Sequence, residues 1–308
     1  MKTLPRHLAL GANPVALGIG FAVLGFFLFT VMDTAAKALS GGYPIHQIVF
    51  FNALFTMVPV TLLVLKTGGV SGLSRDVLPL IALRGASGMI AALAGFFAFS
   101  QMPLADVYAV VFAAPLFITA LSVPVLGETV GLRRWSAVIV GFVGVIIMLN
   151  PGAGLLSLGA VGAIIGALGY ATSVLLTRKI GTRASAGTVA LFSNLVVLSV
   201  MGPWTVIDHV LPSLADLGLF ACVGLLGGTG LICIISAFRA MPAAIIAPFQ
   251  YTQMIWGVAF GYVIWGDIPT IRIAIGCAIV IASGLYIVHR ETHLGRPTLR
   301  KKGSATIG

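Results

Sequence analysis

The chain carries little charge for its length. Only 8% of its 308 residues are Asp, Glu, Lys or Arg, whereas 59% are hydrophobic and the mean hydropathy is +1.09. Soluble globular domains carry about 25% charged residues, so a soluble globular domain is excluded. The apolar runs are long enough to cross a bilayer, which takes about 20 residues of helix. The sequence therefore predicts an all-α membrane protein.

Residues that usually carry enzyme chemistry are also scarce. The chain has 8 acidic residues, 5 histidines and 3 cysteines. The histidines lie at or outside the ends of the apolar runs, without an HExxH pair, and Cys222, Cys233 and Cys277 lie inside apolar runs as packing residues. A nucleotide-binding loop is absent as well. We therefore expect no catalytic residue, metal or cofactor, although a membrane-embedded enzyme and a non-transporting scaffold stay open as alternatives.

The basic residues are unevenly placed along the chain, whose net charge is +10. If the N-terminus is cytoplasmic, sixteen of the eighteen Lys and Arg residues fall on the cytoplasmic side, and only Lys37 and Arg272 fall on the other. Such asymmetry sets orientation in membranes. It predicts that both termini are cytoplasmic (N-in/C-in) and that the basic residues contact anionic lipid headgroups, with no nucleic-acid partner.

Hydropathy, with Gly and Pro as punctuation, predicts ten transmembrane helices. The loops between them are too short to hold a soluble domain. The first run is expected to be a retained span, since it is longer than the core of a signal peptide. The expected spans are residues 14–38, 44–66, 77–100, 104–127, 131–150, 156–179, 186–206, 212–238, 242–266 and 270–289.

The chain contains one unit twice. The string AFSQMP ends at Pro103 and AFRAMP ends at Pro242, while a Gly-acid pair ends at Glu128 and another at Asp267. Both landmarks recur after 139 residues (103 to 242, 128 to 267) without a gap, which indicates an internal repeat. At an offset of about 141, three earlier residues, Gly25, Phe29 and Lys37, fall on Gly166, Tyr170 and Arg178.

This repeat predicts the domain organisation. Residues 1–150 would form the first copy with five spans, residues 151–290 the second, and residues 291–308 a basic cytoplasmic tail. Because five is an odd number, the second copy would be inverted in the membrane. Inverted repeats are the architecture of many secondary transporters, which bind substrate near the midplane between the repeats. We therefore expect a carrier that works by alternating access; a channel is the alternative, without a filter-like segment to favour it.

Several short motifs resemble those of EamA-type transporters of the drug/metabolite transporter superfamily. The resemblance covers nearly the whole chain to about residue 290. It implies a bacterial inner-membrane carrier for small organic solutes, often an exporter of amino acids, with the third, fourth, eighth and ninth helices around a central cavity. Uptake of a vitamin or nucleotide-like metabolite is the alternative. The clearest motifs are Pro115-Leu116, Leu126-Gly127-Glu128, Arg134-Trp135 and Gly141-Phe142-Val143-Gly144-Val145.

Charges at membrane depth cost about 2.5–3.5 kcal/mol at a helix centre, so each is a candidate for function. Asp33 is four residues before Lys37 near the outer end of the first span. It is either a proton or substrate-amine site, or the partner of a snorkelling Lys37 in a structural pair. Arg84 lies one or two turns into the third span, where its planar guanidinium could bind a substrate carboxylate, reach lipid headgroups or close an inner gate.

Three other carboxylates are weaker candidates for a functional role. Glu128 and Asp267 directly precede the fifth and tenth spans, and both copies contain one. We predict that they cap these helices, because a carboxylate stabilises the positive end of a helix and its free amide groups. Asp106 could shape the outer vestibule.

The expected solute contacts are uncharged. Gln250, Gln253 and Gly257 follow helical spacing and form one polar stripe in the ninth span. Amide side chains in lipid would be unsatisfied, so the stripe is predicted to face protein or a water-filled cavity. Aromatic residues at related positions of the two copies, or near the stripe, are further candidates for the cavity wall, with packing as the alternative: Phe29, Tyr108, Phe112, Tyr170, Tyr251 and Trp256.

Two prolines lie within predicted spans. Pro115 falls in the fourth span and Pro248 in the ninth. Proline removes a backbone hydrogen bond and tends to kink a helix, so both are hinge or gate candidates. The expected partners of the protein are a small-molecule substrate and the bilayer, and we expect it to act as a monomer.

Overall fold

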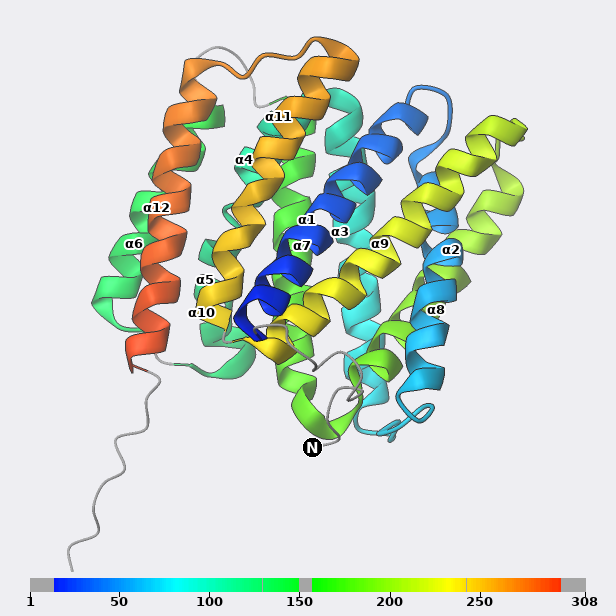
Figure 1. The fold of residues 1–308 in the computed structure, drawn as a ribbon, viewed down its shortest axis with the longest axis horizontal. Coiled ribbons are helices and arrows are strands. Elements are labelled where there is room, and N and C mark those ends of the chain that lie inside the picture. Colours follow the sequence, from blue (N-terminus) through cyan, green and yellow to red (C-terminus); the bar gives the residue numbers. More distant parts are fainter. Residues whose placement is uncertain (1–13, 129, 150–156, 242, 295–308) are drawn as a thin grey trace, which may run out of the picture.

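The computed structural model describes residues 14–128, 130–149, 157–241 and 243–294 of the chain. Every regular element in these ranges is a helix, and the helices form one bundle (Figure 1). The predicted boundary at residues 150 and 151, Pro242 of the second Met-Pro corner and the tail after Leu294 lie outside the described residues.

Twelve α-helices and two 3₁₀ segments follow one another in the described chain, separated by short connections. They are α1 (Pro14–Leu39), α2 (Ile45–Lys66), α3 (Leu78–Gln101), α4 (Leu104–Val111), α5 (Ala114–Leu126), α6 (Leu132–Leu149), α7 (Leu158–Ile180), η3 (Gly181–Arg183), α8 (Ala186–Ile207), α9 (Leu214–Ala240), α10 (Ala243–Ile246), η4 (Ala247–Tyr251), α11 (Thr252–Trp265) and α12 (Ile271–Leu294).

Seven helical segments are long and apolar enough to cross a membrane, and Ile271–Ile287 forms a shorter apolar helix. The predicted class, an all-α membrane protein with several spans, is confirmed. The seven segments are Val15–Leu39, Ile45–Lys66, Leu78–Gln101, Leu104–Leu126, Leu158–Arg183, Ala186–Ile207 and Leu214–Phe238.

The bundle has two ends, which we name from Figure 1. At the upper end α1 ends at Leu39 and α11 ends at Trp265; at the lower end α5 ends at Leu126 and α7 ends at Ile180. The beginning of α1 and the end of α12 both lie at the lower end (Figure 1).

Gly127 and Gly266 end helices rather than begin them. Both have positive φ, 70° and 73°, and both follow the last residue of a helix, α5 or α11. The next residue in each case returns its amide to the helix: Glu128 N donates to Ser122 O, and Asp267 N donates to Gly261 O. Gly127 N and Gly266 N also donate to Val123 O and Tyr262 O, four residues back, which is the bond of an αL helix C-cap. The prediction that Glu128 and Asp267 cap the following helices is therefore wrong. Helices α6 and α12 begin four residues after these carboxylates, which is too far along the chain for an N-cap residue.

The predicted fourth and ninth spans are broken helices. The break between α4 and α5 is at Phe112 and Ala113, and α10 continues into the 3₁₀ segment η4 before α11 begins at Thr252. The two breaks lie at the same place in the two copies, 139 residues apart. Pro115 and Pro248 occupy the first turns of α5 and η4, where proline is well tolerated because that turn has free amides. They start new segments rather than kink a continuous helix.

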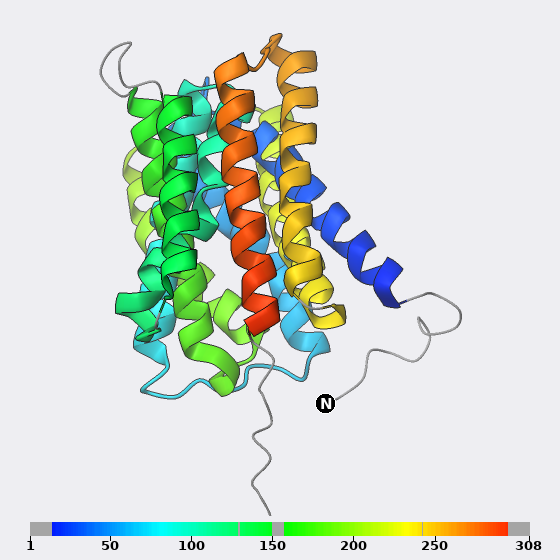
Figure 2. The ribbon, with the colours of Figure 1, turned by 90° about the vertical axis from the view of Figure 1, so that its left-hand side faces the viewer.

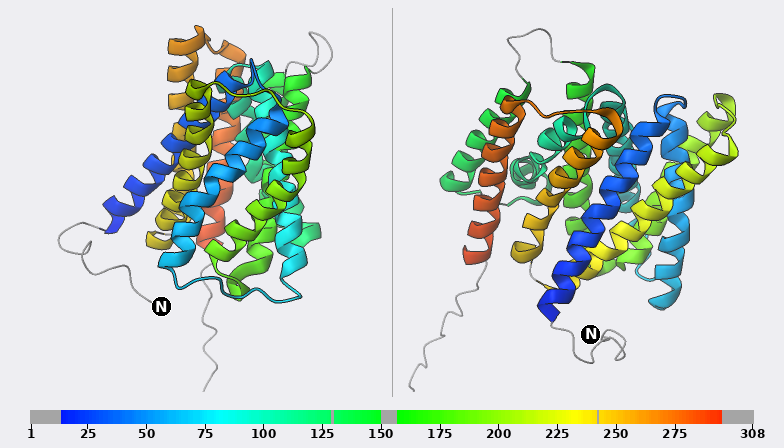
Figure 3. Two further views of the ribbon diagram at one scale, coloured as in Figure 1. Left: turned by 90° about the vertical axis from the view of Figure 1, so that its right-hand side faces the viewer. Right: turned by 45° about the horizontal axis from the view of Figure 1, so that its top comes forward.

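Glycines allow the closest helix pairs, which are α1 with α9 and α3 with α7. A Cβ on Gly230 of α9 would lie 3.1 Å from the carbonyl oxygen of Gly25 in α1, and one on Gly169 of α7 would lie 2.9 Å from that of Ser87 in α3. Helices α6 and α12 also pack together, through Gly144 and Gly276. Figure 2 shows α12 at the front of this face, with α1 tilted away, and Figure 3 shows α1 beside α9 and α2 beside α8.

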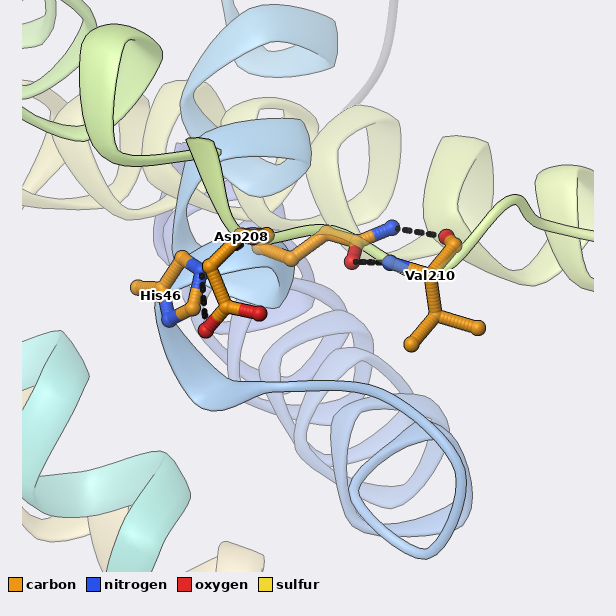
Figure 4. Close-up of polar contacts among 4 residues, drawn as sticks. His46, Asp208 and Val210 are labelled. Carbon is orange, nitrogen blue, oxygen red and sulfur yellow. Dashed lines mark hydrogen bonds and ion pairs between the residues drawn. The ribbon is translucent and has the colours of Figure 1, made fainter. Parts of the chain in front are cut away.

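A loop is held at each end by the start of a helix from the other half of the chain. At the upper end, Gln47 of α2 donates to Val210 O at 2.8 Å and accepts from Val210 N at 2.9 Å, while His46 Nε2 lies 2.7 Å from Asp208 O (Figure 4). At the lower end, Thr188 Oγ1 of α8 accepts a bond of 2.9 Å from the backbone amide of Ser71.

These two loop contacts correspond to each other in the repeat. Thr188 follows Gln47 by 141 residues, and Val210 follows Ser71 by 139. The offsets are those of the sequence repeat, so the same contact occurs at opposite ends of the bundle with the two halves exchanged.

Candidate functional site

A buried carboxylate and a buried phenol meet between α1 and α4. Tyr108 donates a hydrogen bond of 2.8 Å to Asp33 Oδ2, and the two residues are 2% and 7% exposed. Gly257 of α11 makes room for the ring, since a Cβ there would lie 2.5 Å from Tyr108 Cε2. Asp33 has no ion-pair partner among the described residues. The alternative in which Asp33 pairs with Lys37 is wrong.

Lys37 closes the upper end instead. Its Nζ donates a hydrogen bond of 2.6 Å to Met102 O, lies 3.7 Å from Asp267 Oδ2 and stands 5.0 Å from the centre of the Trp265 ring. The Lys37 side chain is only 12% exposed and that of Asp267 27%. Lys37 therefore does not snorkel to the membrane surface. It joins α1 to the end of α11, and a cation over an indole ring adds attraction.

The lower end carries the equivalent ion pair. Arg178, in the last turn of α7, donates a hydrogen bond of 2.8 Å to Glu128 Oε1, which follows α5. Arg178 is the repeat counterpart of Lys37, and Glu128 is that of Asp267. Each ion pair thus joins the basic residue of one copy to the acidic residue of the other.

Two aromatic residues meet at the helix breaks. The rings of Phe112 and Tyr251, which are repeat counterparts, are 5.1 Å apart with an edge-to-face geometry. Phe112 also stacks on Tyr108 at 6.2 Å. The Tyr251 hydroxyl reaches Gly284 of α12 so closely that no Cβ would fit there. A continuous aromatic row therefore runs from the Asp33 partner to the middle of the bundle.

The predicted polar stripe lies beside this row. Gln253 is 8% exposed, and neither its amide nor that of Gln250 forms a hydrogen bond with another described residue. Trp256, which packs edge-to-face on Phe27 at 5.2 Å, has a buried Nε1 that also lacks a partner. Buried polar groups are normally hydrogen-bonded, so unpaired donors here are available to a solute.

Arg84 and Tyr170 lie on the facing helices α3 and α7, which pack closely beside them, since a Cβ on Gly169 would lie 2.9 Å from the carbonyl oxygen of Ser87. Arg84 Nε is buried without a hydrogen bond, and Arg84 forms no ion pair within the described part of the chain. Tyr170 is 44% exposed although α7 is the most buried of the apolar segments. This pair lies apart from Asp33, nearer the lower end.

Phe29 belongs to another environment. It packs against Phe26 at 6.5 Å and close to Gly230 of α9. A cavity of about 280 Å³ lies elsewhere, at the upper end between α2 and α8, and Gln47 and His209 line it.

Sequence reasoning missed the roles of Met102, Trp265 and Gly257. The first two hold Lys37, and the third gives Tyr108 its place against α11. The repeat did contain a signal for the ion pairs. Lys37 and Arg178 are related by one offset and Glu128 and Asp267 by another. The predicted topology places Lys37 on the same side as Asp267 and Arg178 on the same side as Glu128, so offsets and topology together would have predicted both pairs.

The fold and these contacts define a multi-pass helical membrane protein built from two related halves. Residues 16–150 and 157–289 each match the EamA-like transporter family, so the chain belongs to that family. The predicted resemblance is confirmed.

The curated relatives are transporters that span nearly the same length. The pseudopaline exporter CntI of Pseudomonas aeruginosa (strain UCBPP-PA14) is 27% identical over 88% of this chain and 93% of its own. The S-adenosylmethionine uptake transporter of Rickettsia bellii (strain RML369-C) is 25% identical over 90% and 94%. A protein of known crystal structure shares the fold with a TM-score of 0.60 at 17% identity, covering 89% of this chain and 98% of its own.

Proposed function

We propose that the protein is a secondary transporter with ten membrane spans in two inverted five-helix repeats. It acts as a single chain in a bacterial inner membrane and moves a small organic metabolite by alternating access. The lower end faces the cytoplasm, because the basic residues that follow the positive-inside rule lie at that end. In this reading α4 with α5, and α10 with η4 and α11, are single broken spans.

The exchange of contacts between the two copies carries this proposal. A two-fold axis in the membrane plane moves each copy onto the other and turns it upside down. Lys37–Asp267 at the upper end then falls on Arg178–Glu128 at the lower end. Phe112 and Tyr251 exchange places while staying in contact, so they lie beside the axis. Repeats related in this way are a transporter architecture with the substrate site at their interface.

The two ion pairs have the position required of gates. Each joins the two copies at one end of the bundle and leaves the other end untouched. Rocking of one copy against the other would break one pair while the other holds, which exposes the centre to one side at a time. The broken helices at the centre provide the hinge, because the α-helical bonding pattern is interrupted there: Ala113 N donates to Val110 O, three residues back, and η4 is a 3₁₀ segment.

The solute site lies beside the aromatic row and the unpaired amides of Gln250 and Gln253. An amino acid or an amino-acid-like metabolite suits it, because such solutes carry both donors and acceptors for amides and an apolar part for the rings. Export is the direction favoured by the likeness to the pseudopaline exporter. Uptake is the second candidate, favoured by the likeness to the S-adenosylmethionine uptake transporter.

Counterflow in proteoliposomes tests the function without assuming a driving gradient. Vesicles preloaded with an unlabelled compound are given the same compound with a radiolabel, across amino acids, S-adenosylmethionine and vitamins. Accumulation of label above that in protein-free vesicles supports a carrier. No accumulation with any member of the panel contradicts it.

The site is tested by replacing Gln250 and Gln253 together with leucine. The loss of both amides is expected to raise the half-saturating concentration at least about tenfold, since each charge-free hydrogen bond contributes about 1 kcal/mol and the two act together. Gln101→Leu is the matched control, because Gln101 is exposed at the upper end and its amide forms a hydrogen bond only with Ser100 among the described residues. If the half-saturating concentration of the double variant equals that of the parent, Gln250 and Gln253 do not bind the solute.

A further inference from the structure

Arg84 has no anionic partner among the described residues. It is only partly exposed, and its Nε is buried without a hydrogen bond. A guanidinium that has lost part of its water without gaining an anion is costly, because nothing replaces the lost hydration. Proteins rarely bury Arg in this way unless it binds something.

Arg84 does not point toward lipid. The exposed apolar residues of α3 near it are Leu78, Leu83 and Ile90, which are 47%, 54% and 47% exposed. At about 100° per residue, Arg84 lies about 100° to 120° around the helix from each of them. It also begins about 9 Å from the lower end of α3. Its orientation is therefore toward α7 and the interior of the bundle.

Tyr170 shows that the interior is accessible here. The exposed residues in the first half of α7 are Leu158, Val161 and Ile165, which share one face. Tyr170 follows Ile165 by five residues, so it lies about 140° around the helix from that face. It nevertheless is 44% exposed. Its accessible surface therefore borders open space inside the bundle rather than lipid.

We propose that Arg84 and Tyr170 form an anion subsite, on the lower half of the transport path, that binds a carboxylate of the solute. The inference rests on the proposed function and names the chemistry of its substrate class. A guanidinium offers two parallel donors that match the two oxygens of a carboxylate, and the Tyr170 hydroxyl supplies a third. One cation neutralises a monoanion completely, whereas a dianionic phosphate would leave excess negative charge in the membrane.

Matched pairs of compounds test the subsite by binding to the purified protein. The probes are S-adenosylmethionine with its decarboxylated form, and L-phenylalanine with phenethylamine; binding is read from the thermal shift on titration. The parent is expected to bind at least one acid about tenfold or more tightly than its amine. Arg84→Gln should remove that preference and leave the amine unchanged, Arg84→Lys should retain part of it, and Tyr170→Phe should weaken the acid alone. Equal binding of acids and amines by the parent, or no binding of either acid, would overturn the inference.

A second measurement needs no ligand. Because the unloaded subsite holds an unpaired charge, Arg84→Gln is expected to raise the Tm of the ligand-free protein, whereas replacing an arginine with a structural role would lower it. Arg183→Gln is the control, since Arg183 is an exposed arginine at the same end that lies 3.7 Å from Asp76. A lower Tm for Arg84→Gln overturns the inference. Carboxylate preference without counterflow would instead reject the transport function and keep the subsite.

Discussion

The upper and lower ends of the bundle carry the same ion pair in different surroundings. At the upper end Lys37 has three neighbours, Asp267, the Met102 carbonyl and the Trp265 ring, and little of it reaches solvent. At the lower end Arg178 and Glu128 have a shorter contact, but their side chains are 48% and 34% exposed. Burial strengthens an ion pair only when other groups satisfy the charges, and exposed pairs contribute about 0–1 kcal/mol.

This difference indicates which way the described structure is open. The upper end is held by several interactions, one of them a bond of 2.6 Å to a carbonyl. The lower end is held by a pair that water can replace, and Tyr170 above it is 44% exposed. We infer a state whose upper gate is shut and whose interior is reached from below. Four predictions test this comparison, from the largest expected effect to the smallest.

Asp33→Asn is expected to remove the pH dependence of transport. A buried carboxylate with one phenol as its partner and no cation is best accommodated with a proton, so Asp33 can carry that proton between the two sides. The measurement is the counterflow and gradient-driven rate from pH 5 to pH 8 for parent and variant. Asp106→Asn is the control for a second carboxylate at the upper end. Identical pH profiles for Asp33→Asn and the parent would exclude Asp33 as the proton carrier.

Lys37→Met is expected to lower the free energy of unfolding by about 2 kcal/mol, because it leaves Asp267 poorly solvated and unpaired. The change is read from the thermal midpoint in detergent. The double variant Lys37→Met with Asp267→Asn should recover part of the loss, since the Asp267 carboxylate then no longer remains unpaired. A double variant no better than Lys37→Met would mean that the pair with Asp267 is unimportant.

Arg178→Met at the lower end should cost less than about 1 kcal/mol. Its effect should shrink further at high salt, because exposed charges are screened. The same unfolding measurement at two salt concentrations gives the loss in free energy of unfolding and its reduction by salt. If the loss in free energy of unfolding equals or exceeds that of Lys37→Met, the lower ion pair stabilises the fold at least as much as the upper one. The inferred state is then incorrect.

The smallest effect is expected at Asp76, an exposed residue in the lower loop before α3. The Ser74 hydroxyl, with a weaker contribution from Arg183, holds the pKa of Asp76 below its ordinary value. A lowered pKa in the folded state stabilises the fold above the ordinary pKa of 3.8 and loses that effect as the pH falls through the folded value. The thermal midpoint of Asp76→Asn should therefore be slightly lower than that of the parent at pH 7, and the difference should shrink as the pH falls below 3.8. A difference that grows on acidification contradicts this.

The sequence predicted the apolar segments well because hydropathy reports transfer into lipid, which each segment experiences alone. It did not predict the breaks at Phe112–Ala113 and in η4, since a change in backbone hydrogen bonding leaves hydropathy unchanged. Pro115 and Pro248 indicated where the spans are irregular, but not that a new helical segment begins there. Asp33 and Tyr108 were both candidates, yet their bond joins residues 75 positions apart. Pairings at such separations depend on helix packing, which periodicity within one helix does not contain.

The contact between Phe112 and Tyr251 has a consequence for the energetics of transport. In a carrier made of two identical halves, the form open to the outside and the form open to the inside would be superimposable and equal in free energy. Here Tyr251 of the second half carries a hydroxyl that lies against Gly284, whereas its counterpart Phe112 in the first half has no hydroxyl. In the proposed carrier, sequence divergence between the two halves would therefore favour one of the two open forms, through small differences such as this one.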